Sequence, residues 1–224
     1  MKKILLHTIL FVSLPIYSQQ IGNGMSIITA KQRLDLSKGN DVDEKNIEGS
    51  PYFTTTFLPA TVTGYEGMFL LRYNAYKDEM EFQSEGKILF VIKSDSMEVN
   101  FTNSKKNYKY TLYNSDKGNV KGFLVKLSTG EKVSLFKREK VKLIPKVEAA
   151  NSYASEVPAH YEFQKETFYI KKMDGIVTFP KNKKELVKMF PDKESQIVDF
   201  LKNNSISFSK ESDLVTLVTF LNSI

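Results

Sequence analysis

Hydrophobic and polar residues alternate along the middle of the chain, from residue 51 to residue 180. The stretch 68–76 shows the alternation clearly, and its polar face carries Arg72, Asn74 and Tyr76. A period of two residues is typical of a β-strand that buries one face and exposes the other. The middle of the chain is therefore predicted to be a β-rich body.

Several further segments of this body have the length and composition of strands. Lys77–Glu79 is predicted as a turn, and a second strand begins at Met80–Phe82. The segment Lys87–Lys93 is apolar along most of its length, so it is expected to lie in the centre of a sheet. The remaining predicted strands are 108–113, 122–128, 132–138, 161–171 and 176–179, and residues 139–144 are interpreted as an extension of the hairpin that 122–128 and 132–138 form.

The hydrophobic pattern changes to a period near 3.6 residues after residue 180, which predicts helices. Asn182 followed by Glu185 has the spacing of a capping box and begins the first helix. Pro191 ends that helix, Asp192 begins a second one, and Ser209 begins a third. Each segment has one apolar stripe, so these helices are expected to pack on the body or on each other.

Strands that come first and helices that come last favour an α+β domain with a mainly antiparallel sheet. The short strands suggest a curved sheet, a sandwich or a partly open barrel, followed by two to three C-terminal helices. The predicted organisation is a signal peptide at 1–19, a polar lead-in at 20–50, the β-rich body at 51–180 and the helical segment at 181–224. The body and the helical segment are expected to form one domain.

The first residues have the order of a secretory signal peptide. Met1–Lys3 is positively charged, Ile4–Ile16 is mostly apolar, and Tyr17–Gln20 is polar. The apolar run is too short to span a membrane comfortably, and a buried N-terminal helix is the alternative interpretation. We expect cleavage after Ser18 or Gln19 and a mature protein in the periplasm or outside the cell.

The composition excludes several classes of chemistry. The chain has 224 residues, of which 41% are hydrophobic and 26% charged, so it can form a packed core. Cysteine is absent and the two histidines are His7 and His160. Disulfides, thiolate metal sites, a cysteine nucleophile, a lipoprotein anchor and a metal site of several histidines are therefore excluded. No cofactor and no metal site is predicted.

Lysine residues gather beside tyrosines and on the first predicted helix. Lys105, Lys106 and Lys109 flank Tyr108, and Lys181 lies at the start of that helix. The net charge of +6 falls to about +4 when the signal peptide is removed, because Lys2 and Lys3 leave with it. This mild charge and the expected export argue against nucleic acid as a partner. The lysines are interpreted as a solvated surface, or as a surface attracted to anionic lipid or polysaccharide.

Three carboxylates, Asp78, Glu79 and Glu81, lie close together in the sequence. Paired carboxylates are what glycoside hydrolysis needs, when they face each other across a substrate. Neighbours in a hairpin turn normally point into solvent instead. A carboxylate-dependent envelope hydrolase is therefore kept only as an alternative.

Two sequence motifs resemble a group of exported proteins of Bacteroidota. Gly49–Tyr52 reads G-S-P-Y, and Leu71–Phe82 reads L-R-Y-N-A-Y-K-D-E-M-E-F. The tail adds three shorter matches, at Lys183–Leu186, Phe200–Lys202 and Asp213–Val215. The resemblance covers roughly residues 45 to 224 and implies an exported bacterial protein, and it carries no activity with it.

The candidate binding residues are Arg72, Asn74, Tyr76 and Asp78. Their alternative role is to fix the register and turn of the hairpin, since Arg72 can pair with Asp78 or Glu81 and since Asn and Asp favour turns. The leading hypothesis is a non-enzymatic envelope protein that binds a protein, polysaccharide or lipid partner. A carrier of an apolar ligand in a half-open β cavity is the first alternative.

Overall fold

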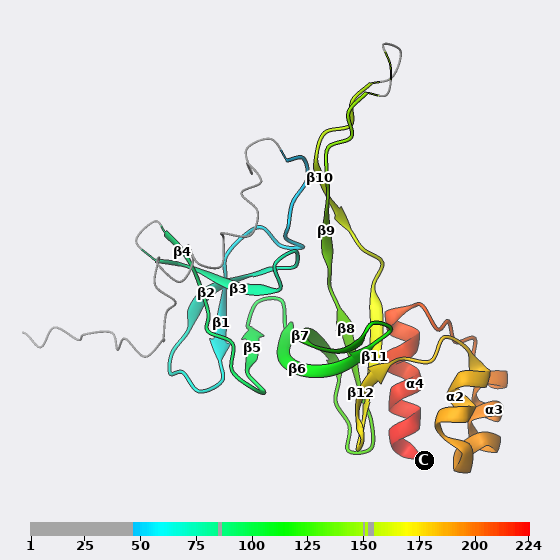
Figure 1. Cartoon of the computed structure of the whole chain (residues 1–224). Helices are drawn as coiled ribbons and strands as arrows, with labels where there is room; N and C mark the ends of the chain where they lie inside the picture. Colours follow the sequence, from blue (N-terminus) through cyan, green and yellow to red (C-terminus); the bar gives the residue numbers. More distant parts are fainter. Residues whose placement is uncertain (1–46, 85–86, 150, 152–154) are drawn as a thin grey trace, which may run out of the picture.

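The computed structural model describes residues 47–84, 87–149, 151 and 155–224. The predicted signal peptide, and the predicted polar lead-in up to residue 46, lie outside these ranges. Strands come first and helices last, so the predicted α+β class is confirmed (Figure 1). The strands are β1 (Leu58–Val62), β2 (Phe69–Asn74), β3 (Glu79–Ser84), β4 (Lys87–Phe90), β5 (Glu98–Phe101), β6 (Asn107–Ser115), β7 (Gly118–Ser128), β8 (Ser134–Arg138), β9 (Val141–Ile144), β10 (His160–Phe163), β11 (Thr167–Lys172) and β12 (Gly175–Thr178).

Ten of these strands form one sheet, in the order β12-β11-β8-β7-β6-β5-β1-β2-β3-β4. Its neighbours pair antiparallel, except that β12 also meets β6 in parallel at Val177 and Asn114. That contact curls β6, β7, β8, β11 and β12 into a five-stranded barrel-like unit. The partly open barrel among the predicted architectures is thus the one that forms.

The interior of the barrel is filled by side chains. Each of its five strands contributes one buried residue, and these are Tyr113, Leu124, Phe136, Tyr169 and Ile176. A small barrel of this kind has a packed core and not a lumen. An apolar ligand would therefore have to bind outside the barrel.

A second core lies between the open part of the sheet and the outer face of the barrel. Leu71 from β2, Met80 from β3 and Val99 from β5 pack there with Phe123 from β7. All four are almost completely shielded from solvent. Alternation along the strands produces this arrangement, because residues of one face point into the same layer.

The helices form a third layer on the other side of the barrel: α2 (Lys183–Met189), the 3-10 helix η2 (Pro191–Lys193), α3 (Glu194–Asn203) and α4 (Glu211–Ser223). Their core joins Leu186, Ile197 and Leu217 to Leu135 and Phe168 of the barrel. The predicted cap at Asn182 is confirmed, since its side chain accepts a hydrogen bond from the Glu185 amide at 3.0 Å, while the Glu185 carboxylate accepts from the Lys181 amide and not from that of Asn182. Among the described residues, no helix is both long and apolar enough to cross a membrane.

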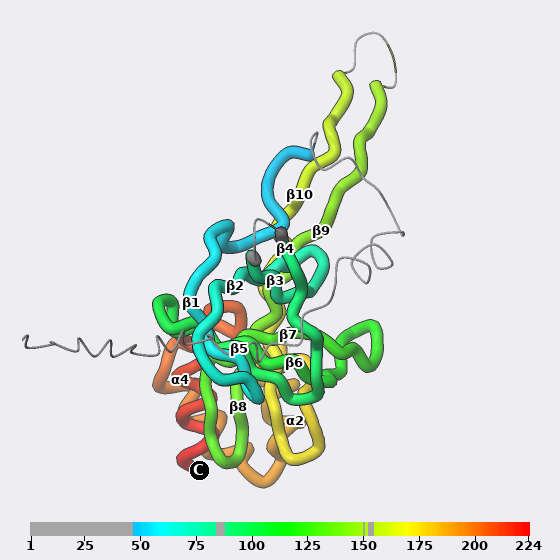
Figure 2. The backbone as a smooth tube through the Cα atoms, turned by 90° about the vertical axis from the view of Figure 1, so that its left-hand side faces the viewer, coloured from blue at the N-terminus to red at the C-terminus, as the bar shows by residue number. Residues whose placement is uncertain are grey.

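Strands β9 and β10 form a separate two-stranded ribbon that leaves the body. Figures 1 and 2 show it extending away from the barrel in two perpendicular views. The pairing of β9 with β10 continues outward to Val147 and Val157, whose backbone groups exchange two hydrogen bonds of 2.9 Å. We call residues 141–148 and 156–163 the ribbon.

The chain that precedes β1 runs beside the base of the ribbon. Glu48 bridges His160 in parallel, and the Tyr161 amide donates to the Glu48 carbonyl at 2.8 Å. Gly49 follows with a φ of 83°, and a Cβ there would lie 3.0 Å from the Tyr161 carbonyl oxygen. The glycine of the G-S-P-Y motif is therefore required by its backbone angle and by this close approach.

Two strand predictions are wrong. The apolar segment that was expected in the centre of a sheet forms β4, which lies at the sheet edge. It is apolar because Phe90 and the following Val91 are buried in the core, not because strands flank it on both sides. The segment expected as one strand at 161–171 is divided into β10 and β11, because Gln164–Glu166 leads the chain from the ribbon back to the barrel.

Candidate functional site

Arg72 and Glu81 form a buried ion pair at the predicted site. The β2–β3 ladder places them directly opposite each other. The Arg72 Nη2 atom lies 2.7 Å from Glu81 Oε2, and the exposed fractions of the two side chains are 12% and 4%. The pairing of Arg72 with Glu81, one of the two predicted options, is confirmed.

The guanidinium of Arg72 is also enclosed by the segment that carries the G-S-P-Y motif. It stacks at 3.7 Å from the centre of the Tyr52 ring and at 4.4 Å from that of Phe57. Its Nη1 donates to the Thr55 carbonyl at 3.0 Å, and its Nη2 donates to the Tyr52 hydroxyl at 2.8 Å. The two motifs of the resemblance thus meet at Arg72, which fastens residues 52–57 onto the sheet.

Asn74 connects the ion pair to the turn that follows β2. Its Nδ2 donates to Glu81 Oε1 at 2.8 Å, and its Oδ1 accepts from the Tyr76 and Lys77 amides at 3.2 and 3.0 Å. An asparagine that bonds to amides two and three residues ahead stabilises a turn. The structure thus supports the alternative role of these residues in fixing the hairpin.

Tyr76 and Asp78 lie apart from that ion pair. Strand β2 ends at Asn74, so the prediction that Tyr76 shares a strand face with Arg72 is wrong: a turn begins at Ala75. The Tyr76 ring packs edge-on against Tyr161 at the base of the ribbon, with 5.4 Å between ring centres. That Arg72, Asn74, Tyr76 and Asp78 bind a ligand stays a prediction, and the fold already uses each side chain.

The three neighbouring carboxylates do not point freely into solvent, contrary to expectation. Glu81 bonds Arg72, Glu79 accepts from Lys93 Nζ at 2.8 Å, and Asp78 accepts from the Tyr73 hydroxyl at 2.6 Å. They therefore have three different partners. Across the residues that the structure describes, no group of three or more Asp, Glu or His side chains is arranged to hold a metal ion.

Asp78 is held in a buried environment that favours its protonated form. It has a φ of 57°, and its Oδ1 also accepts from the Phe123 amide at 3.2 Å. Burial raises the pKa of the Asp78 carboxyl above its usual value, although the Tyr73 hydroxyl, Lys93, the Phe123 amide and Arg138 act in the opposite direction. The folded protein therefore binds this proton more tightly than the unfolded chain does.

This raised pKa predicts how Asp78→Asn changes stability with pH. The stabilisation that comes from Asp78 is fully present below the pKa that this carboxyl has in the unfolded chain. It is lost as the pH rises through the pKa that the carboxyl has in the folded protein. Asparagine keeps an oxygen acceptor and tolerates the left-handed backbone, but it does not titrate. We expect the variant to gain stability relative to wild type as the pH rises from about 3 to about 7, measured by urea unfolding.

Asp213→Asn is a control of opposite sign, because the Ser207 amide and other donors lower the pKa of the Asp213 carboxyl. Asp213 stabilises the folded state when the pH is above the pKa that this carboxyl has in the unfolded chain. Its replacement by asparagine therefore lowers the free energy of unfolding more as the pH rises. A stability difference for Asp78→Asn that is constant with pH, or that runs in the same direction as the control, would contradict the account of Asp78.

The predicted lysine groups are partly used in ion pairs. Lys106 bonds Glu139 at 2.6 Å and Lys109 bonds Glu98 at 3.1 Å. The lone histidine of the described residues, His160, has Nδ1 3.1 Å from the Pro158 carbonyl oxygen at the start of β10. These contacts match a structural role for the three side chains.

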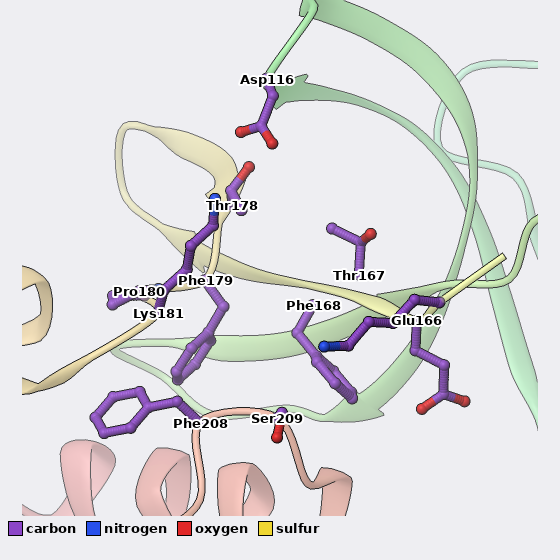
Figure 3. Close-up of a pocket in the computed structure, with 11 residues that line it drawn as sticks. Asp116, Glu166, Thr167, Phe168, Thr178, Phe179, Pro180, Lys181, Phe208 and Ser209 are labelled. Carbon is purple, nitrogen blue, oxygen red and sulfur yellow. The ribbon is translucent and has the colours of Figure 1, made fainter.

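A cleft of about 690 Å³ lies between the barrel and the helices, and sequence patterns did not reveal it. Its walls come from four separate segments: the β6–β7 turn, the start of β11, the end of β12 with the residues after it, and the chain before α4. Figure 3 shows Phe168, Phe179 and Phe208 on one side and Asp116 with Thr178 on the other. The cleft therefore has an apolar side and a polar side.

The outer part of the ribbon is a second surface that the sequence did not indicate. Val147 and Val157 lie directly opposite each other, with exposed fractions of 56% and 46%. Nearer the body, Phe163 is 49% exposed, and its ring forms a T-shaped pair with the Phe53 ring, at 4.8 Å between centres. The ribbon thus exposes apolar side chains along its length.

No family model, no curated protein and no solved structure matches this chain.

Proposed function

We propose that this chain is an exported binding protein without catalytic activity, which attaches to a protein partner of the cell envelope through the ribbon. The single observation that carries the proposal is the exposed pair Val147 and Val157 on a two-stranded ribbon that leaves the body.

Within the described ranges of the chain, the outer part of the ribbon has no second layer of structure packed on it. An isolated two-stranded hairpin is marginally stable in water, because it has no second layer against which to bury its side chains. Opposite valines stabilise each other across the strands, but Val147 and Val157 still leave about half of their surface in water. A partner that covers this face would supply the missing layer, which is how exposed apolar surface functions in many interfaces.

The ribbon also carries features that limit unspecific pairing. Pro145 and Lys146 follow β9, and Lys142 lies within it. Proline and lysine on an edge discourage open-ended strand addition. We therefore infer that the partner contacts the side-chain face of the ribbon and does not simply extend its backbone ladder.

Site-specific photo-cross-linking tests this proposal. A photoreactive amino acid is placed at position 147 in the full chain, which is produced in its native envelope. We expect one discrete protein adduct larger than the chain itself. Position 173 is the control, because Met173 is fully exposed in the β11–β12 turn but lies outside the ribbon.

Attachment through the ribbon is contradicted if position 147 gives no adduct. It is also contradicted if position 147 gives the same adducts as position 173. An adduct of twice the chain mass contradicts an envelope partner and indicates a second copy instead.

A further inference from the structure

We propose that the cleft between the barrel and α4 binds a short zwitterionic peptide with apolar side chains. This site is separate from the ribbon, since no residue of 141–148 or 156–163 lines it. Its volume of about 690 Å³ lies within the range of sites that hold a drug-sized ligand.

The charges that line the cleft fall into two groups. Glu166 is already ion-paired, because it shares Lys137 with Glu211: the Lys137 Nζ lies 2.8 Å from Glu166 Oε1 and 2.7 Å from Glu211 Oε2. Figure 3 shows the Glu166 carboxylate pointing away from the other labelled side chains. This buried lysine ties the start of β11 to the start of α4 and so fixes one wall of the cleft.

The remaining charged side chains are Lys165, Lys181 and Asp116. Among the described residues, none of the three has an ion-pair partner for its charged group. Figure 3 shows the Lys181 side chain extending toward Thr178, on the side of the cleft where Asp116 lies. The cleft therefore presents two lysine ammonium groups and one carboxylate that do not form ion pairs with each other.

This arrangement fits a ligand that carries both charges. A carboxylate is recognised by Lys181 and Lys165, and an ammonium group by Asp116. A ligand with a net negative charge would gain the lysines but meet the Asp116 carboxylate, so a zwitterion is favoured over a simple anion. Short peptides have these two charges at their ends.

The uncharged walls fit the rest of such a peptide. Phe168, Phe179 and Phe208 form the apolar side, and Phe208 is more exposed than the other two. The hydroxyl groups of Thr167, Thr178 and Ser209 can donate to and accept from peptide amides. An apolar side chain on the peptide would cover the Phe208 ring, since Phe168 and Phe179 are already buried.

Calorimetric titration of the full chain with the tripeptide Leu-Phe-Leu tests the proposal. The same peptide is also used with an acetylated amino terminus and with an amidated carboxyl terminus. We expect saturable binding of the free peptide, and a loss of about tenfold in affinity when either end is capped, since a charge-assisted hydrogen bond is removed.

Protein variants locate the two ends. Asp116→Asn is expected to weaken the free peptide about tenfold and to leave the acetylated peptide unchanged. Lys181→Gln is expected to weaken the free peptide about tenfold and to leave the amidated peptide unchanged. Lys188→Gln on α2 is the matched control, because Lys188 does not line the cleft, and it should change none of the affinities.

Four results would overturn the proposal. The first is that no tripeptide binds saturably, and the second is that capping either end leaves the wild-type affinity unchanged. The third is that the Asp116 and Lys181 variants weaken free and capped peptides equally. Loss of affinity on amidation alone would identify a simple anion as the ligand and would also contradict a zwitterion.

Discussion

Glu81→Ala is expected to be the most destabilising single change in the sheet. It removes the partner of a guanidinium that is 12% exposed, and it also removes an acceptor from Asn74 and from the Tyr52 hydroxyl. Breaking one side of a buried ion pair typically costs about 3–5 kcal/mol, because the other charge stays buried. We expect thermal unfolding to begin about 10 °C lower than in wild type.

Glu79→Ala is the matched control for that change. It lies two residues earlier on β3 and also loses an ion pair, with Lys93, but the two side chains are 22% and 23% exposed. A pair of this kind contributes about 1 kcal/mol or less. If the two alanine variants unfold at the same temperature, the Arg72–Glu81 pair does not hold residues 52–57 onto the sheet.

The second large effect is expected where α4 meets the β7–β8 turn. The Asn222 Oδ1 accepts from the Lys132 and Val133 amides at 3.0 and 3.1 Å, and its Nδ2 donates to the Val133 carbonyl at 3.0 Å. A Cβ at Gly130 would overlap the side-chain amide of Asn222. Gly130→Ala is therefore expected to displace the Asn222 amide and to cost about 2–4 kcal/mol.

A double-mutant cycle shows whether the two residues act together. Asn222→Ala alone should cost a similar amount, since the two turn amides lose their acceptor. Once Asn222 is absent, Gly130→Ala should cost much less, so the effects in urea unfolding are strongly non-additive. Asn204→Ala, which loses one exposed bond to the Phe200 carbonyl, serves as the control. Additive effects of Gly130→Ala and Asn222→Ala would contradict direct contact.

The sequence predicted features that depend on local periodicity. The alternation at 68–76 gave β2, and the spacing of Asn182 and Glu185 gave the cap of α2. Both patterns report which side chains share a face or a turn, and that information lies within a few residues. The pairing of Arg72 with Glu81 was also available, because a hairpin places such residues opposite each other.

Features that depend on distant segments were not available from the sequence. The apolar run of β4 carried no sign of an edge position, because burial by core packing and burial between strands produce the same composition. Lys181 was interpreted as part of a solvated helix surface, although it lines the cleft. Asp116 and Phe208 come from opposite parts of the fold, so only tertiary structure brings them to one site.

The exposed valines of the ribbon were missed for a related reason. The pattern at 139–144 was interpreted as an extension of the preceding hairpin, which would have placed it in the main sheet. Instead β9 pairs only with β10, in a sheet of two strands. Val147 and Val157 lie beyond both strands, and their exposure follows from the direction in which the ribbon leaves the body.

Native mass spectrometry of the full protein released from its own envelope fraction tests whether the ribbon attaches the chain to a partner. It compares wild type with Val147→Lys/Val157→Glu, a variant that replaces the apolar pair by opposite charges and keeps a favourable cross-strand contact. We predict a protein-sized additional mass on wild type that is absent from the variant, with equal melting temperatures for the two. The bare chain mass for wild type, or an additional mass that the variant retains, would contradict attachment through the ribbon.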